Sequence, residues 1–301
     1  MNLTYNQFEA LVYIDQKQDE KISQRKLADA LQISLGNVNS VLQELGENEF
    51  LIKSSGKYEV TKKGYEALAP YRVKKAIFIA AGFGSRLVPI TLNTPKPLIR
   101  VHGKRIIDSL LAAVAKAEIE DITIVRGYLG EQFDVLKNKY PQIKFIENPM
   151  YNEANNISSA YLVRAELDHA YVLESDLVLY NSDIIRKYEY NSNYCGIPVE
   201  VSDDWCFQTS QKVITHLGIG GRNCYQMVGI SYWDSEDANK MKDDLKMVFE
   251  SPGGKELYWD EVALGKCMNK YKLHVKSVKA DDIIEIDTTN ELKEIDPIYN
   301  V

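Results

Sequence analysis

The chain has 301 residues, of which 45% are hydrophobic and 26% are charged, which is typical of globular proteins and sufficient for two domains. Its net charge of −7 argues against a protein whose main role is to neutralise nucleic-acid phosphates, so small-molecule partners are expected. No basic stretch precedes an apolar one at the N-terminus, and no segment approaches the roughly 18 apolar residues of a membrane span, so we expect a cytoplasmic protein without membrane contact.

Residues 1–70 carry the pattern of a winged helix-turn-helix domain. Apolar residues recur at helical spacing in three segments, 8–14, 27–31 and 38–45. The segment 50–60 then alternates apolar and polar residues around a Ser-Ser-Gly turn, as the two strands of a wing would. The character of the sequence changes near Pro70, which predicts a domain boundary there.

The charge of residues 1–70 does not favour DNA binding. They hold eight Lys and Arg against ten Asp and Glu, a balance of −2. The expected recognition helix, SLGNVNSVLQEL, has no basic residue for phosphate contacts, although Asn37, Asn39 and Gln43 could read bases. Dimerisation or docking is the favoured role, which leaves a homodimer open. The alternative is a DNA-binding regulator that senses a nucleotide or a choline metabolite.

From residue 71 to 301 strands alternate with helices. Short apolar runs predict strands at 76–81, 122–125, 143–146 and 171–174. Helical periodicity lies between them, at 106–117, 131–140 and 157–167. This order predicts an α/β domain with a Rossmann-like, mostly parallel sheet flanked by helices. Ligands of such sheets bind at the carboxyl ends of the strands, so the loops after Ala81 and Ser175 are expected to carry the chemistry.

The loop after the first of these strands has the features of a phosphate-binding loop. Gly82 and Gly84 let the backbone turn sharply and present N–H groups to phosphate oxygens. Arg86 can bind phosphate bidentately, and Lys96 adds a compact charge at the far end. A lone G-x-G would be weak evidence. The segment lacks the Lys-Ser/Thr of a Walker loop and the third glycine of a dinucleotide fingerprint.

Residues 82–96 follow the pattern G-x-G-S-R-x-x-P-x-T-x-x-x-P-K, which resembles the signature of nucleotidyltransferases that activate sugar phosphates and phosphocholine. The resemblance to bacterial phosphocholine cytidylyltransferases of the choline-incorporation type extends almost to the end of the chain. It rests on the further stretches GYLGEQFDVLKNKY, YNEANNISSAYLV, LESD, GISYWD, LYWDE and IIEID. It implies a nucleotidyltransferase fold and transfer of CMP from CTP to phosphocholine, giving CDP-choline and pyrophosphate.

The acceptor stays open within this resemblance. Closely similar enzymes activate 2-aminoethylphosphonate and phosphoethanolamine, whose primary ammonium could donate hydrogen bonds to carboxylates. A sugar 1-phosphate is less expected, because no lysine-rich acceptor site is evident between Trp205 and Trp259.

Displacement of pyrophosphate requires a divalent cation, for which Mg²⁺ is expected. Asp176 ends the apolar strand of YVLESD, and in the family resembled this position binds magnesium. Glu285 and Asp287 in IIEID lie on one face of an expected strand, because side chains alternate. The predicted metal ligands are therefore Asp176, Glu285 and Asp287. The alternatives are a turn aspartate for Asp176 and a helix N-cap for Asp287.

A quaternary ammonium cannot donate a hydrogen bond, so its recognition requires aromatic faces and a nearby carboxylate. By resemblance, Trp205, Tyr258 and Asp260 are the best candidates for a choline-binding box, and Trp259 of the same LYWDE stretch joins the predicted substrate-binding set. The alternative is that any one of the aromatic residues belongs to the core.

The expected mechanism follows from the loop and the resemblance. CTP is expected to contact a nucleotide-binding set made of Ala81, Gly82, Gly84, Ser85, Arg86, Lys96 and Asn155. The acceptor phosphate is already an anion, so it can attack the α-phosphorus without a general base. The predicted catalytic residues are Lys96, which bridges both reactants, Arg86 and Asp176. For Asn155 and its neighbour Asn156, helix capping is an equally good interpretation.

Overall fold

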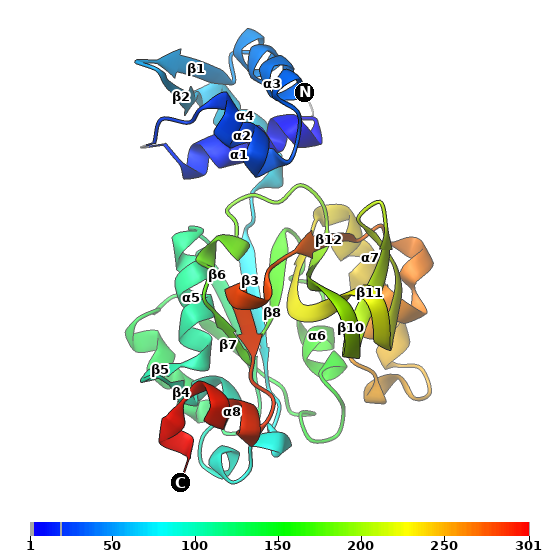
Figure 1. Cartoon of the computed structure of the whole chain (residues 1–301). Helices are drawn as coiled ribbons and strands as arrows, with labels where there is room; N and C mark the ends of the chain where they lie inside the picture. The colour runs from blue at the N-terminus through cyan, green and yellow to red at the C-terminus, as the bar shows by residue number, and fades with distance from the viewer. Residues whose placement is uncertain (1–2, 19, 301) are drawn as a thin grey trace. The chain divides into compact units, whose positions relative to one another are not determined.

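The computed structural model of the chain describes residues 3–18 and 20–300. They form two compact units, and Figure 1 shows the elements of each. The first unit ends at Arg72 and also includes Tyr188–Tyr190, and the second contains Val73–Lys187 and the residues from Asn191 onward. The sequence predicts the boundary at residue 70. Within the described ranges, every helix is too short or too polar to span a bilayer.

Three helices and a hairpin make up most of the first unit. They are α1 (Tyr5–Gln16), α2 (Gln24–Leu31), α3 (Leu35–Glu47), β1 (Leu51–Ser54) and β2 (Lys57–Val60), followed by α4 (Lys62–Leu68). Ser23 and Ser34 cap α2 and α3, because their hydroxyls accept hydrogen bonds from backbone N–H groups of the first turn. The elements lie where the sequence predicts them, and the assignment as a winged-helix domain stays a prediction.

Tyr188–Tyr190 reach the first unit from a distant part of the sequence. Tyr188 is buried in the apolar cluster of the helices, and the ring of Tyr190 stacks on that of Tyr71 with centroids 5.1 Å apart. Tyr190 also contacts Phe8, at 5.2 Å between ring centroids. A unit this small has a limited core, so the added aromatic rings contribute a large share of it. Nothing in the local sequence pattern indicates this contribution.

A seven-stranded sheet forms the centre of the second unit, in the order β10-β12-β11-β8-β3-β6-β7. Its strands are β3 (Lys75–Ala80), β6 (Asp121–Arg126), β7 (Lys144–Glu147), β8 (Ala170–Glu174), β10 (Asn193–Ser210), β11 (Val213–Trp233) and β12 (His274–Ser277). β3 is parallel to β6 and β8, and β7 is parallel to β6, which confirms the predicted parallel arrangement in this half. β11 runs antiparallel to β8, so the other half is mixed.

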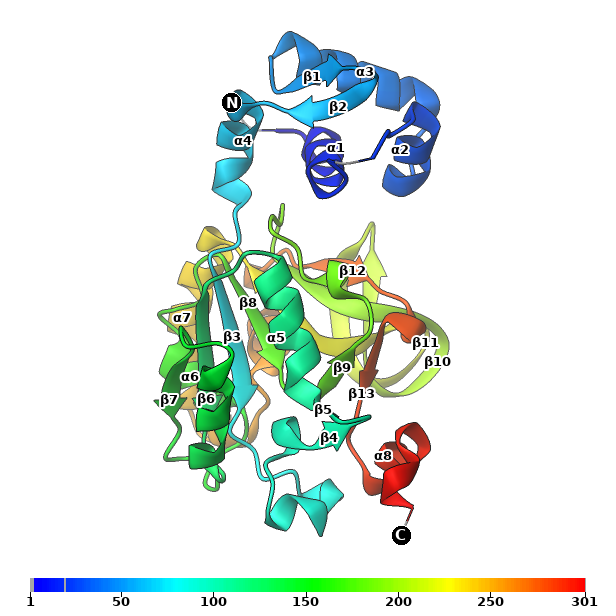
Figure 2. The same ribbon diagram turned by 90° about the vertical axis from the view of Figure 1, so that its left-hand side faces the viewer.

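Side chains of β3 alternate between two apolar layers, because successive residues of a strand point to opposite faces. Phe78 belongs to the layer with α5 (Ile106–Lys116). Ile77 and Ile79 belong to the layer with α6 (Ile157–Val163) and α7 (Ser235–Phe249). Figure 2 shows helices on both sides of the strands. The predicted layering of a Rossmann-like α/β domain is thus confirmed, and it leaves the carboxyl ends of β3 and β8 available for a ligand.

Shorter elements complete the second unit. β4 (Arg100–Val101) pairs with β5 (Lys104–Arg105), β9 (Leu177–Leu179) pairs with β13 (Ile283–Glu285), and α8 (Thr289–Ile295) follows β13. The helical stretch predicted at 131–140 is a 3-10 helix, at Gly130–Asn138. Three residues per turn place Phe133 and Leu136 on one face, and both are buried.

The substitution Phe78→Ala is expected to lower the free energy of unfolding of the second unit by about 3–5 kcal/mol, because Phe78 is fully buried and its removal leaves a cavity. The three tryptophans of the chain all lie in this unit, so a urea titration followed by tryptophan fluorescence reports its unfolding. The control is Val135→Ala on the exposed side of the 3-10 helix, expected to change the stability by about 0.5 kcal/mol or less. Equal midpoints for the two variants would contradict the assignment of Phe78 to the core.

Candidate active site

A cavity of about 560 Å³ opens where β3 and β8 end. Its wall is formed by the loop after β3, the turn after β8, the start of α6, the β10–β11 hairpin, the segment 258–261 and the segment that follows β13. All predicted site residues except Trp259 lie in this wall. The carboxyl ends of the parallel strands therefore bring together residues that are up to about 200 positions apart in sequence, as this fold does for its ligands.

The glycine loop has its conformation fixed at Gly84. This residue has a φ of 68°, in the left-handed region that favours glycine. A Cβ here would lie 3.1 Å from Cγ2 of Thr91 and 3.2 Å from Cβ of Lys96. The Thr91 hydroxyl also donates a 3.0 Å hydrogen bond to the carbonyl of Gly84. The loop thus folds back on itself and holds Lys96 close to Gly84, and Gly82 faces open space in which a ligand can approach the backbone.

Lys96 lines the cavity and pairs with two carboxylates. Its Nζ is 2.8 Å from Oδ2 of Asp176 and 2.7 Å from Oδ1 of Asp287, and its side chain is only 12% exposed. Burial acts to lower the pKa of Lys96, but the charges of Asp176 and Asp287 outweigh it and raise that pKa. Lys96 is therefore a cation at neutral pH. Arg86, mostly exposed, reaches the same Asp287 oxygen at 2.7 Å, so both predicted cations of the loop lie at one place.

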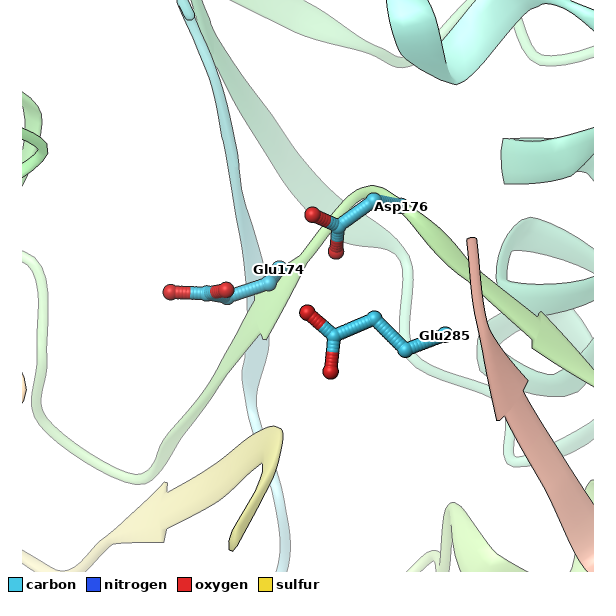
Figure 3. A group of neighbouring side chains, drawn as sticks. All are labelled: Glu174, Asp176 and Glu285. Atoms are coloured by element: carbon cyan, nitrogen blue, oxygen red, sulfur yellow. The ribbon is translucent and has the colours of Figure 1, made fainter. Parts of the chain in front are cut away.

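Three carboxylates, those of Glu174, Asp176 and Glu285, lie within 4.8 Å of one another. Figure 3 shows them extending from the end of β8, the turn after it and β13. Burial, followed by the charge of Asp176, raises the pKa of Glu174 and of Glu285 well above the usual range. Oδ1 of Asp176 is buried and makes no hydrogen bond. An all-oxygen group with an unpartnered carboxylate oxygen fits a hard divalent cation such as Mg²⁺.

Two of the three predicted metal ligands, Asp176 and Glu285, belong to this group. The third predicted ligand, Asp287, is ion-paired with Lys96 and Arg86, whereas the third member of the group, Glu174, is not among the residues predicted from the sequence. Which of these four carboxylates bind a metal stays a prediction. A sequence signal for Glu174 exists, since it stands two residues before Asp176 in YVLESD. β8 ends at Glu174, and side chains two residues apart at the end of a strand can point into the same space, so Glu174 can join Asp176.

Two aromatic rings and a buried carboxylate, those of Trp205, Tyr258 and Asp260, form a further part of the cavity wall. The ring centroids of Trp205 and Tyr258 are 6.0 Å apart with the ring planes inclined by 70°, and Tyr258 is 44% exposed. Asp260 is buried beside them and accepts a hydrogen bond from the hydroxyl of Tyr194. Burial raises the pKa of Asp260 to about 7, although the hydrogen bond from Tyr194 acts in the opposite direction. This part of the wall can hold a cation between aromatic faces and a carboxylate.

The prediction of Trp259 as a substrate-binding residue is wrong. Its side chain is 1% exposed, lies outside the cavity wall and packs against Trp233 and Tyr194, with ring centroids 5.9 and 6.3 Å apart. The alternative interpretation, a core aromatic residue, holds for this position. Trp259 stands between Tyr258 and Asp260, whose side chains line the cavity while its own is directed into the core.

Asn155 and Asn156 fix the segment that carries Tyr258 and Asp260. The Asn155 amide donates to the carbonyl of Glu256 at 3.1 Å. Asn156 donates to Oε1 of Glu174 at 3.1 Å and accepts from the backbone N–H of Trp259 at 2.9 Å. Neither side chain acts as the cap that sequence reasoning offered as an alternative. Asn155 lines the cavity, and its contact with a nucleotide stays a prediction.

Residues 75–194 match the family described as nucleotidyl transferase. The chain is similar to the 2-aminoethylphosphonate cytidylyltransferase of Lancefieldella rimae, with 36% identity over 228 residues that cover 74% of this chain and 92% of that protein. It is also similar to the choline-phosphate cytidylyltransferase of Streptococcus pneumoniae, with 31% identity over 226 residues that cover 74% and 97%.

A solved structure shows the same relationship in three dimensions. The structure of the CTP:phosphocholine cytidylyltransferase from Streptococcus pneumoniae matches this chain with a TM-score of 0.70 and 31% sequence identity. The match covers 75% of this chain and 99% of that one. The relatives share cytidylyl transfer in their names and differ in the acceptor.

Proposed function

This chain belongs to the nucleotidyltransferase family, and from that premise we propose that it transfers CMP from CTP to phosphocholine, giving CDP-choline and pyrophosphate. One observation supports the proposal most. A single cavity holds the glycine loop, a group of three carboxylates, and the Trp205–Tyr258 pair beside Asp260. These parts fit a nucleoside triphosphate, a divalent cation and a cationic phosphorus acceptor, in that order.

The residues suggest how the transfer proceeds. Backbone N–H groups at Gly82, Gly84 and Ser85 bind phosphate oxygens of CTP, and Arg86 leaves Asp287 to bind the same phosphates.

The carboxylates of Glu174, Asp176 and Glu285 would hold Mg²⁺, which would neutralise charge on the α-phosphate and the leaving group. Lys96 lies between this group and the loop and binds the non-bridging oxygens on which charge develops. The acceptor phosphate attacks as an anion, so no side chain needs to remove a proton.

A second acceptor, 2-aminoethylphosphonate, is favoured by two observations. A relative that acts on it is 36% identical to this chain. In addition, the part of the cavity wall formed by Trp205, Tyr258 and Asp260, which we call the acceptor end, also contains Glu261. A primary ammonium can donate hydrogen bonds to these carboxylates, whereas a quaternary ammonium cannot. Both acceptors carry a cation two carbons away from the oxygen or phosphorus of the reacting group, so the same cavity suits both.

Pyrophosphate release measured with each of the four nucleoside triphosphates against phosphocholine, phosphoethanolamine, 2-aminoethylphosphonate and glucose 1-phosphate tests the proposal. We expect the highest kcat/KM for CTP with phosphocholine and no turnover of glucose 1-phosphate, because the acceptor end of the cavity is built for a cation. Higher activity with 2-aminoethylphosphonate would mean that this compound, and not phosphocholine, is the acceptor, while the proposed cytidylyl transfer would hold. Release from no pair at all would contradict the proposed function.

For the first unit we propose a winged-helix domain that serves in dimerisation or docking rather than DNA binding. The exposed residues of α3 include Glu44 and Glu47, and the helix LGNVNSVLQELGE contains no lysine or arginine. Without a cation on this helix, contact with DNA phosphates would lack its main source of affinity.

A further inference from the structure

Tyr194 on β10 lies directly behind the acceptor end of the cavity. Its side chain is 0% exposed, and its ring packs against Phe207 and Trp259, with centroids 6.3 Å away in each case. Its hydroxyl donates a hydrogen bond to Oδ1 of Asp260, whose side chain forms part of the cavity wall. Tyr194 itself does not line the cavity, and its hydrogen bond reaches the cavity wall through Asp260.

Asp260 needs this donor because its surroundings disfavour a charge. It is 3% exposed, and the titratable groups that act on it are the Tyr194 hydroxyl from β10, Glu261 from its own segment and Glu174 from β8. These groups are neutral or anionic. A buried carboxylate without a cation nearby tends to bind a proton, and a hydrogen-bond donor to the charged form counteracts this.

We propose that Tyr194 is a positioning residue that keeps Asp260 ionised and oriented toward the cationic end of the acceptor, and so sets the affinity for the acceptor but not for the nucleotide. The inference rests on the proposed function for the identity of the acceptor. It assigns the specificity of the cavity for cations to a pair of residues 66 positions apart, one of which never touches the ligand.

The pH dependence follows from the sign of the charge. Only the ionised form of Asp260 attracts a cation, and its pKa is raised to about 7. Acceptor affinity is therefore present above that pH and is lost as the pH falls through it. Removing the Tyr194 hydroxyl removes an interaction that lowers the pKa of Asp260, so the loss moves to higher pH.

The substitution Tyr194→Phe is expected to raise KM for phosphocholine about fivefold at pH 7, because a rise of about one unit from a pKa of about 7 leaves roughly a tenth rather than half of Asp260 ionised; KM for CTP and kcat should change less than about twofold. The acid limb of the kcat/KM profile for the acceptor should move to higher pH, and at pH 9 the two proteins should differ little. A merely structural loss would affect both substrates at every pH.

Tyr271→Phe is a matched control. The Tyr271 hydroxyl donates a 2.8 Å hydrogen bond to Oδ2 of buried Asp244 in the same apolar layer, outside the cavity wall. The Tyr271→Phe substitution should leave KM for both CTP and phosphocholine unchanged. Equal effects of the two substitutions, or a Tyr194→Phe variant with unchanged acceptor KM, would overturn the proposal.

Calorimetric titration of wild type and Tyr194→Phe with choline and with ethylamine separates this proposal from the proposed function, because it requires no turnover. Weaker binding of either cation by the variant at pH 7 supports the role of Tyr194 even if no nucleotide is transferred. Equal binding by the two proteins, or no binding by either, would overturn it.

Discussion

The substitution Lys96→Ala is expected to lower kcat for pyrophosphate release by about 10³-fold, at the upper end of what loss of one preorganised charge-stabilising donor costs. The Lys96 side chain is 12% exposed and carries its charge between Asp176 and Asp287, so its ammonium group does not have to reorganise when charge develops on the α-phosphate. KM for CTP should change much less, because the loop backbone and Arg86 still bind the other phosphates.

The control for this variant is Lys116→Ala. Lys116 also forms a 2.7 Å ion pair, with Asp183, but its side chain is 61% exposed and lies outside the cavity wall. Its loss should leave kcat within about twofold and cost little stability, as surface ion pairs do. Steady-state pyrophosphate release with saturating CTP and phosphocholine measures both variants. A Lys96→Ala protein with near-normal kcat would show that the charge between the reactants is supplied elsewhere.

The glycine loop was predictable from sequence because its requirements are local. A backbone that presents N–H groups to phosphate needs glycine at defined positions, and the φ of Gly84 and its contacts with Thr91 and Lys96 involve residues within about a dozen positions of one another. The strands β3, β6 and β8 were equally clear, since buried parallel strands read as apolar runs.

The rest depended on contacts between distant residues. Glu174 has room in the carboxylate group because Gly229 on β11 has no side chain. A Cβ at Gly229 would lie 2.6 Å from Cγ of Glu174. Tyr194 meets Asp260 only after β10 is placed beside the segment that follows η7 (Gly254–Glu256). The length of β10 and β11, at 18 and 21 residues, far exceeds the usual strand and was not predicted.

Trp259 shows the limit of a pattern. In LYWDE the aromatic and acidic residues all suit a cation site, but neighbouring side chains point in different directions, and the backbone N–H of Trp259 donates to the side chain of Asn156, which immediately precedes α6. Which of Tyr258, Trp259 and Asp260 faces the cavity is decided by that bond and by the core next to it, neither of which is visible in the local sequence.

The substitution Asp176→Asn is expected to lower kcat/KM by at least about 10³-fold, because Asp176 is the member of the carboxylate group that also contacts Lys96. Asparagine keeps the shape and removes the charge, so the variant should fold. It should also require a much higher Mg²⁺ concentration for its residual activity, since one of three anionic ligands is neutral.

Asp183→Asn, the partner of the Lys116 control, removes an exposed aspartate whose ion-pair distance is 2.7 Å, against 2.8 Å for Asp176, and should leave the Mg²⁺ dependence unchanged. Binding of Mn²⁺, followed by water-proton relaxation in the absence of substrates, gives a readout that does not depend on turnover. Weaker Mn²⁺ binding by Asp176→Asn but not by Asp183→Asn would place the metal at the carboxylate group. Unchanged Mn²⁺ binding together with lost activity would instead mean that Asp176 acts by orienting Lys96, and the divalent cation would then have to be held by other residues.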